Sequence, residues 1–320
     1  MGFYYSQFFV QPAYPTQSFA GQTVIVTGAN VGLGLEASRH LVRLQAEKVI
    51  LAVRNVAAGE EAKRDVELST GRIGVCEVWE LDLASYASVQ AFAYKATQLP
   101  RLDVVIANAA IATATFSIAE GHERTITVNV ISTILLTLLL LPKLRETAEK
   151  HPQANRPRIS VVVSETHAWT PFPEYKAENI FEKLDDPTAA DMTDRYASSK
   201  LMDILILREM VHRASGAWPE VVNMVNPGLC HSRLARELGW GFWLFKQVVA
   251  RSTEVGSRTL VLGAAAGPES HGKYMVNGKV DDSALSGFVR SPEGRNAQQK
   301  LWEELVPILE GIKPGIMQNL

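Results

Sequence analysis

Cysteine is scarce in this sequence, which has only two among 320 residues. Cys76 and Cys230 are too few for a disulfide framework and do not have the spacing of a metal site. Free thiols fit a reducing compartment, and Cys230 is most simply a small buried residue. We therefore expect neither a disulfide-stabilised secreted domain nor a bound metal.

An excess of one charge and a long apolar run are also missing. The chain has 32 basic and 34 acidic residues, so neither nucleic-acid binding nor an acidic tail is indicated. The longest apolar run, Ile131–Leu141, is broken by a serine and two threonines and is shorter than the ~20 residues of a membrane span. Residues 1–20 lack the lysine or arginine with which a secretory signal starts. We expect a soluble, cytoplasmic protein, with peripheral membrane contact left open.

Strand and helix signals alternate along the chain from Thr23 onward. Short apolar runs, each followed by a segment with helical spacing, indicate a parallel sheet that helices cover on both faces. No linker or internal repeat divides the chain. We predict an α/β fold with one doubly wound domain at residues 21–320, preceded by an aromatic extension at residues 1–20. The predicted strands are 23–27, 48–53, 75–81, 102–107, 158–163 and 220–225, and the predicted helices are 36–45, 57–68, 85–98, 125–141 and 196–213.

A glycine-rich segment, Thr-Gly-Ala-Asn-Val-Gly-Leu-Gly at residues 27–34, lies between the first predicted strand and the first helix. Gly28 permits a tight turn, Gly32 lets the backbone approach a pyrophosphate, and Gly34 allows close helix packing. The helix N-terminus adds free N–H donors. Such glycines also mark ordinary turns, but the strand before and the helix after them favour a dinucleotide site. The predicted contacts are Gly28, Asn30, Val31, Gly32, Leu33 and Gly34.

The end of the second predicted strand indicates which cofactor is used. An acidic residue at this place binds the ribose 2′-hydroxyl, whereas arginine pairs with a 2′-phosphate. The strand ends in Val53-Arg54-Asn55 and has no carboxylate there. A solvated arginine would be the plainer explanation, but Arg54 favours NADP(H) over NAD(H).

Taken with further motifs, these residues resemble the short-chain dehydrogenase/reductase family from about Gly21 to Leu309. The resemblance implies a Rossmann-type domain and a nicotinamide-dependent oxidoreductase. It implies catalytic roles for Asn129, Ser164, Tyr196 and Lys200, the last two forming a Tyr-x-x-x-Lys signature. Beyond the glycine segment and Arg54, it implies cofactor contacts for Asp82, Leu83, Asn108, Ala109, Tyr196, Lys200, Pro227, Gly228, Leu229 and Ser232.

Within the family the chain is similar to the retinol-dehydrogenase-like branch, on the basis of Arg54, His167, Gly272-Lys273-Tyr274 and Leu301-Trp302-Glu303. Its aromatic N-terminus is also similar to fungal members that reduce carbonyls in natural-product pathways. It departs from the family at Ala110 and Val163, where a glycine and a serine are usual, and at Ser232, which keeps the hydroxyl of the usual threonine. Ser164 and Tyr196 are 32 residues apart, more than the usual spacing, which concerns the shape of the pocket.

The residues themselves indicate proton transfer coupled to hydride transfer. Tyrosine has an unperturbed pKa of about 10, and Lys200, one helical turn after Tyr196, should lower that pKa by favouring the phenolate. Ser164 should donate to the substrate oxygen as charge develops there. By the resemblance, Asn129 holds a water that links Lys200 to solvent, although it could simply satisfy backbone groups in a buried helix. His167 is expected to support the pocket wall, and Asp103 to be structural.

Two segments outside the strand–helix alternation should shape the substrate pocket. One is Trp169–Arg195, which contains three prolines, and the other is Leu234–Ser252, which is rich in aromatic residues. The second could be a substrate lid, a membrane-touching helix or plain packing, and a lid is the first choice. The apolar helix 125–141 is most simply core, although it could also form a dimer face. The predicted substrate contacts are Ser164, Trp169, Phe172, Tyr175, Met192, Tyr196 and Trp240.

These residues favour interconversion of a ketone and a secondary alcohol on a mid-sized, apolar small molecule. A ketoreductase of fungal secondary metabolism fits this description. The same tyrosine chemistry could instead serve C=C reduction, epimerisation or dehydration, and a cofactor-binding sensor without turnover is a third possibility. The intact set of Asn129, Ser164, Tyr196 and Lys200 argues against the sensor.

Overall fold

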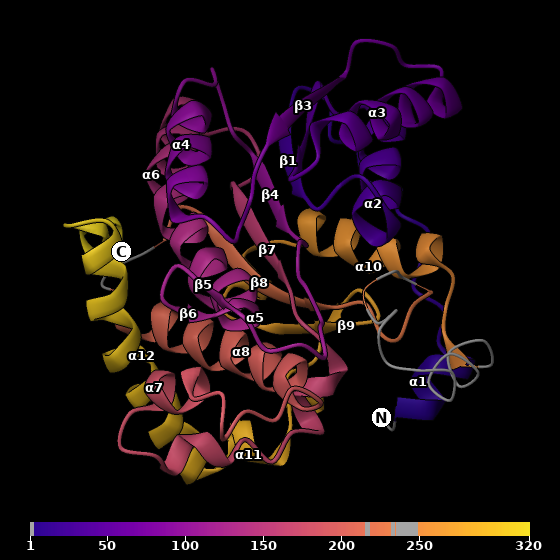
Figure 1. Ribbon diagram of the computed structural model, residues 1–320. Coiled ribbons are helices and arrows are strands. Elements are labelled where there is room, and N and C mark those ends of the chain that lie inside the picture. Colours follow the sequence, from indigo (N-terminus) through magenta and orange to yellow (C-terminus); the bar gives the residue numbers. More distant parts are fainter. Residues whose placement is uncertain (1–2, 215–217, 232–233, 235–248) are drawn as a thin grey trace.

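The computed structural model describes residues 3–214, 218–231, 234 and 249–320 (Figure 1). At its centre, the described residues form an eight-stranded sheet in the order β10-β9-β8-β7-β4-β1-β2-β3. Neighbouring strands are parallel except for β9 and β10, which are antiparallel. The strands are β1 (Thr23–Thr27), β2 (Lys48–Val53), β3 (Cys76–Glu80), β4 (Val104–Ala107), β7 (Arg158–Val162), β8 (Val221–Asn226), β9 (Tyr274–Val276) and β10 (Lys279–Val280).

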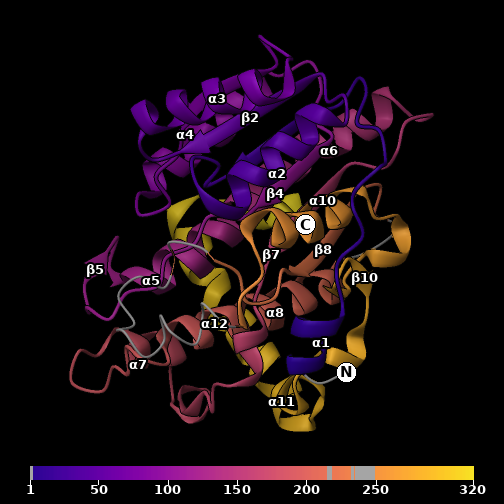
Figure 2. The same ribbon diagram turned by 90° about the vertical axis from the view of Figure 1, so that its right-hand side faces the viewer.

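Helices cover both faces of this sheet, as predicted (Figures 1 and 2). Successive side chains of β1 point to opposite faces: Val24 and Val26 pack into one hydrophobic core, and Ile25 packs into the other. Because both faces are buried, the strand is apolar along its whole length. The first face carries α2 (Gly32–Arg43), α3 (Val56–Thr70) and α10 (Thr253–Ala265), and the second carries α4 (Tyr86–Thr97), α6 (Ser132–Lys150) and α8 (Arg195–Arg213).

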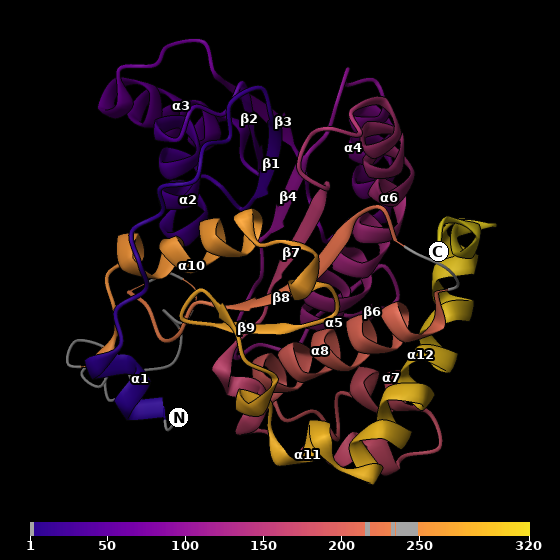
Figure 3. The ribbon, with the colours of Figure 1, turned by 180° about the vertical axis from the view of Figure 1, so that it is seen from behind.

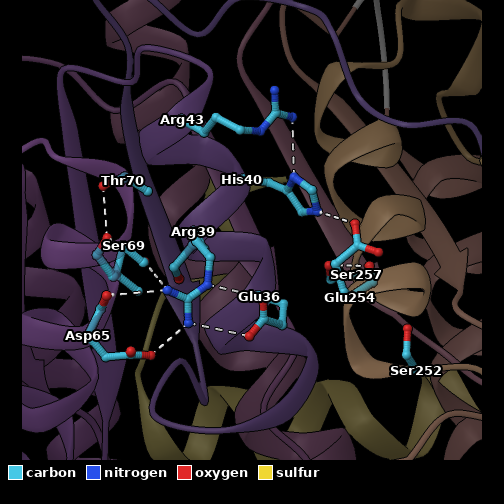
Figure 4. A network of polar contacts seen from close by, with 12 residues as sticks. Glu36, Arg39, His40, Arg43, Asp65, Ser69, Thr70, Ser252, Glu254 and Ser257 are labelled. Carbon is cyan, nitrogen blue, oxygen red and sulfur yellow. Dashed lines mark hydrogen bonds and ion pairs between the residues drawn. The ribbon is translucent and has the colours of Figure 1, made fainter.

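A polar network joins three helices on the first face (Figure 4). Arg39 of α2 forms ion pairs with Glu36, at 3.1 Å, and with Asp65 of α3, at 2.6 Å. His40 of α2 lies 3.0 Å from the carboxylate of Glu254 in α10. These contacts hold α3 and α10 on either side of α2, whose first turn is the predicted cofactor site.

Smaller elements surround these layers. The first helix of the chain, α1 (Phe3–Phe9), is hydrogen-bonded to Leu229 and Arg251, and α12 (Pro292–Ile312) packs along α8 (Figure 3). A hairpin, β5 (Ile118–Ala119) and β6 (His122–Glu123), leads into α5 (Arg124–Ile126). The 164–195 region contains two 3-10 turns, Glu165–Ala168 and Pro173–Lys176, and α7 (Ile180–Asp185), and α11 (Gly287–Arg290) precedes α12.

The six predicted strands are confirmed to within two residues at each end, but β9 and β10 were not predicted. They contain three and two residues. Strands this short show no periodicity of their own, so their conformation depends on pairing: β9 pairs with β8, and β10 pairs with β9. The aspartate at the start of β4 is structural, as expected: Asp103 Oδ2 accepts from Thr23 N of β1 and from Arg101 Nε, both at 2.8 Å.

The long apolar helix is predicted to end at Leu141, but it continues through Pro142 to Lys150. A proline inside a helix leaves the carbonyl four residues earlier without its N–H donor. That carbonyl belongs to Leu138, and it accepts from Asn319 Nδ2 at 3.1 Å. This partner comes from the far end of the chain, so local sequence gives no sign of it. The span Arg124–Lys150 is long and apolar enough for a membrane helix, but 89% of its most apolar window is buried, which identifies it as a core helix.

Candidate active site

The glycine segment forms the turn between β1 and α2 that its sequence predicts. Gly28 and Gly32 both have positive φ, +66° and +62°, a conformation that residues with a Cβ rarely adopt. Val31, at the N-cap of α2, is extended, and no side chain among the described residues caps this helix. The first N–H groups of α2 are therefore available to a negatively charged group.

Gly34 is required for close packing of the turn. A Cβ added there would lie 2.5 Å from Gly28 O and 2.7 Å from Asn108 Nδ2. The Asn108 side chain is already committed, because its Nδ2 donates to Thr27 O at 2.9 Å. The backbone is fixed as well, because the Thr27 hydroxyl accepts from the N–H groups of Asn108 and Ala109, at 3.0 and 2.9 Å. Asn108 thus supports the glycine turn from the neighbouring strand.

We expect Gly34→Ala to lower the free energy of unfolding by about 1–3 kcal/mol, because the added methyl overpacks this turn. Urea denaturation of the purified protein measures the change. Gly311→Ala in α12 is the matched control, since its Cβ would meet nothing within 4 Å. That variant should be neutral or slightly more stable, because alanine is the better helix former. Equal stabilities for the two variants would contradict the proposed packing role of Gly34.

A groove opens at the carboxyl ends of β1, β2, β3 and β4. The strand order reverses between β1 and β4, and ligands of doubly wound sheets bind at such a switch point. The groove brings together six of the predicted cofactor residues, namely Gly28, Asn30, Arg54, Asp82, Leu83 and Ala109. It also contains Arg124 at the start of α5, which the sequence did not reveal because no motif surrounds it. The other lining residues are Ala52, Asn55, Leu81, Ala84, Ala110, Ile111 and Val128.

The predicted proton-transfer residues meet beyond this groove. Ser164 follows β7 and begins the 3-10 turn Glu165–Ala168, where its hydroxyl accepts from Thr166 N at 3.2 Å. Tyr196 lies in the first turn of α8 and is hydrogen-bonded to Ser164 through its side chain. Lys200 lies one turn further along the same helix. The structure therefore joins residues from β7 and α8 into one site, despite their long separation in sequence.

The pKa of Tyr196 differs from the prediction. Burial raises the pKa above the usual value for tyrosine, and this effect outweighs the Lys200 charge and the Ser164 hydrogen bond, which both lower it. Lys200 therefore acts in the predicted direction without determining the result. The phenol is the prevailing form of Tyr196 in this state.

A buried carboxylate accompanies Lys200. Lys200 Nζ donates to Asp203 Oδ2 at 2.9 Å and to Val162 O at 3.0 Å. Asp203 is fully buried, and burial raises its pKa to about 6 although Lys200 opposes the shift. Its negative charge also raises the pKa of Tyr196. Sequence reasoning missed Asp203, although its spacing of three residues from Lys200 on one helix is a recognisable signal.

Asn129 lies in a π-helical turn, Thr127–Ile131, that precedes α6. Its side-chain amide accepts from Ile111 N and donates to Ile111 O, both at 2.9 Å, and donates to Ser199 Oγ at 3.0 Å. Ser199 in turn donates to Tyr196 O at 2.7 Å. The amide thus connects the loop after β4 to the helix that carries Tyr196. π-Helical turns are often found at functional sites.

His167 supports Ser164, as expected. Ser286 N donates to its Nε2 at 3.1 Å, so Nδ1 carries the ring proton and donates to Ser164 O at 2.7 Å. Burial lowers the His167 pKa, which keeps this ring neutral. The histidine therefore holds the backbone of Ser164 and is poorly placed to exchange protons with a substrate.

The predicted substrate contacts have different environments. Trp169 is exposed, Met192 is half-buried, and the ring of Tyr175 lies 5.1 Å from that of Phe288. The prediction for Phe172 needs correction. Its side chain is fully buried in the hydrophobic core, so it supports the 164–195 region instead of lining an open pocket. The predicted substrate contact Trp240 and the predicted cofactor contact Ser232 lie outside the described residues, as does most of Leu234–Ser252.

Comparison with known proteins identifies the family. The short chain dehydrogenase model matches residues 22–165. The chain is 47% identical to the short-chain dehydrogenase anuD of Penicillium roqueforti, over 99% of this chain and 84% of that protein. It is 49% identical to the short chain dehydrogenase atnD of Emericella nidulans, over 85% and 89% of the two chains.

Solved structures share the fold. The RhlG/NADP complex of Pseudomonas aeruginosa superposes with a TM-score of 0.61 at 22% identity, over 82% of this chain and 97% of that one. The NADPH-bound carbonyl reductase of chicken fatty liver superposes with a TM-score of 0.59 at 20% identity, over 82% and 99%. At such identities these structures show the Rossmann-type fold alone, and the sequence relatives show the family. The chain belongs to the short-chain dehydrogenase/reductase family and is an oxidoreductase by that membership.

Proposed function

We propose that this protein is an NADP(H)-dependent oxidoreductase that interconverts a ketone and a secondary alcohol on a mid-sized, apolar molecule. The observation that carries the proposal is the contact of Tyr196 with Ser164 beside the charged Lys200, next to a groove at the switch point of the sheet. These three groups are what a carbonyl oxygen needs when it gains a proton.

The groove fits a phosphorylated dinucleotide. Its glycine turn leaves no room for side chains, and its helix N-terminus is uncapped by side chains. Arg54 lies at its rim after β2, where a 2′-phosphate would need a positive charge. The two structural neighbours named above contain NADP or NADPH, which agrees with this choice. A bound nicotinamide would supply or accept the hydride.

The protein's own residues would move the proton. In reduction, the carbonyl carbon gains a hydride while the Tyr196 hydroxyl transfers its proton to the carbonyl oxygen, which leaves a phenolate. The ammonium of Lys200 stabilises that phenolate through its charge. The Ser164 hydroxyl donates to the substrate oxygen as negative charge develops there. In oxidation the same steps run in reverse, with the phenolate as base. We propose that Asn129 positions the backbone at Tyr196 through Ser199.

Substrate class and cellular setting are also part of the proposal. Trp169, Tyr175 and Met192 would line an apolar pocket between the 164–195 region and the cofactor. The relatives named above are short-chain dehydrogenases of fungi, and we propose that this protein is a ketoreductase of fungal secondary metabolism that acts in the cytoplasm.

The proposal is tested with the purified full chain, NADPH and a mid-sized apolar ketone such as α-tetralone. Deuterated NADPH should transfer its label to the carbinol carbon of the alcohol product. With an enone substrate, label on the β-carbon of the former C=C bond, with the ketone intact, would indicate C=C reduction instead. A ketone panel that consumes no NADPH, despite tight NADPH binding, would contradict the proposed reaction.

The raised Tyr196 pKa predicts how activity depends on pH. The phenol is the acid in reduction, so kcat/KM for the ketone should be constant across neutral pH and fall only in the alkaline range. Oxidation needs the phenolate, so kcat/KM for the alcohol should rise as the pH approaches that pKa. Initial rates in both directions from neutral to alkaline pH measure the two profiles. The prediction would be contradicted if kcat/KM for reduction already decreased as the pH is raised within the acidic range.

A further inference from the structure

The helix α1 is fastened to the loop that follows β8, although more than 200 residues separate them (Figure 3). The Gln7 side chain binds the backbone of Leu229 in both directions. Gln7 Nε2 donates to Leu229 O at 2.5 Å, and Gln7 Oε1 accepts from Leu229 N at 3.3 Å. Gln7 is only 8% exposed, so water competes little for these two bonds.

Arg251 fastens the other side of the same contact. Its guanidinium donates to Ser6 O at 2.6 Å and Val10 O at 2.8 Å, at the end of α1, and to Pro227 O at 3.4 Å. Asn277, in the turn between β9 and β10, accepts from Arg251 at 2.8 Å and donates to the Ser6 hydroxyl at 2.8 Å. A cation at a helix C-terminus also stabilises the helix. Helix α1 is therefore built into the domain.

The loop that Gln7 holds is close to the reaction centre. Gly228 N donates to Asn226 Oδ1 at 2.9 Å, and Asn226 Nδ2 donates to Glu165 Oε2 at 2.6 Å. Glu165 is the residue after Ser164. From the same loop, Cys230 acts electrostatically on the Tyr196 hydroxyl. The loop backbone and these hydrogen bonds thus connect α1 to the Ser164 turn.

Gly228 of this loop is packed closely against Gln7 and Arg251. Gly228 has a φ of +75°, and a Cβ there would lie 2.9 Å from Gln7 Oε1 and 3.1 Å from Arg251 Nη1. Only glycine can follow this path while Gln7 and Arg251 are in place. The carboxamide of Gln7 matches a peptide group, since it donates and accepts at once, which neither a carboxylate nor an amine can do.

We infer that Gln7 is a positioning residue of the active site, and that α1 holds the Pro227–Cys230 loop in place for the cofactor and substrate. The inference rests on the proposed function, because the loop lies at the carboxyl end of β8, where the ligands of such sheets bind. Loss of the Gln7 contacts would let this loop move away from the Ser164 turn. The cofactor would then bind more weakly and the substrate would be held less well.

The test is Gln7→Met, which keeps the length of the side chain and removes both hydrogen bonds. We expect kcat/KM for α-tetralone to fall, and the Kd for NADPH to rise, by about tenfold, in line with the loss of two buried hydrogen bonds. The midpoint of thermal unfolding should stay within about 2 °C of the wild type, since the domain core is untouched. The matched control is Gln17→Met, an exposed glutamine of the same N-terminal segment, which should change neither constant.

Hydrogen–deuterium exchange gives a second measurement that does not depend on activity. In Gln7→Met, exchange should become faster in residues 226–230 and α1, and should stay unchanged in β1, β4 and β7. A kcat/KM and NADPH Kd within twofold of the wild type would overturn the inference, and so would faster exchange spread over the whole domain. Failure of the wild-type protein to bind NADPH would refute the proposed function. The exchange experiment would still report on the Gln7 contact in that case, so the two failures can be told apart.

Discussion

Tyr196→Phe is expected to lower kcat for ketone reduction by about 10³-fold, which is a typical contribution of a positioned general acid. The substitution removes one oxygen atom from a half-buried side chain and leaves the ring in place. Without that hydroxyl, the carbonyl oxygen loses the group that transfers a proton to it. Lys200 then has no phenolate to stabilise. NADPH binding and the unfolding temperature should stay close to those of the wild type.

The measurement is the steady-state rate with saturating NADPH, together with the NADPH Kd from fluorescence. Tyr94→Phe serves as the control, because Tyr94 is an exposed tyrosine on α4 and should be indifferent to loss of its hydroxyl. Activity of Tyr196→Phe within tenfold of the wild type would remove Tyr196 from the chemistry. Equal losses in both variants would point to a fault of preparation and not to catalysis.

The second large effect is expected at Arg54. Arg54→Asp should raise the Kd for NADPH by about 100-fold and change the Kd for NADH by less than about threefold. A charge-assisted contact to a phosphate is among the strong hydrogen bonds, and the new carboxylate would also repel the 2′-phosphate. NADH has a 2′-hydroxyl at that place, which a carboxylate can accept from.

Titration of each cofactor by fluorescence separates the two affinities. Arg64→Asp is the matched control: it makes the same change of charge on an exposed residue of α3, outside the groove lining. A similar loss for both cofactors in Arg54→Asp would exclude a contact to the 2′-phosphate. Loss of NADPH affinity in the Arg64 variant would show that overall charge, and not Arg54, governs the preference.

Much of the fold could be predicted because its signals are local. The strands of a sheet buried on both faces are apolar throughout, as β1 shows, and the helices between them have an amphipathic period. The glycine turn carries its own information in the positive φ of Gly28 and Gly32 and in the contact of Gly34 with Gly28 O, although Gly34 also packs against the distant Asn108. Helix ends are harder to predict, because the Leu138 carbonyl that Pro142 leaves without a helical donor accepts instead from the distant Asn319.

The sequence names the candidate residues of the site but does not give their electrostatics. Motif and spacing were enough to name Ser164, Tyr196 and Lys200. They could not show that burial would outweigh the Lys200 charge at Tyr196, since desolvation depends on the atoms packed around a hydroxyl. For the same reason, Phe172 was taken for a pocket residue, although its place in the core follows from tertiary packing alone.

The sequence by itself determined the alternation of strands and helices, the glycine turn with Arg54 after the next strand, and the four residues proposed for proton transfer. The strand–helix alternation, the glycine turn and the Tyr196–Lys200 pair depend on neighbours in the chain or on spacing along one helix, whereas Asn129 and Ser164 came from the resemblance to the family. Only the tertiary structure decided that Asp203 is fully buried, that Arg124 enters the groove, and that Gln7 holds Leu229. The physical reason is that burial and long-range hydrogen bonds arise when distant segments pack together, and residue order alone does not specify which polar groups then meet.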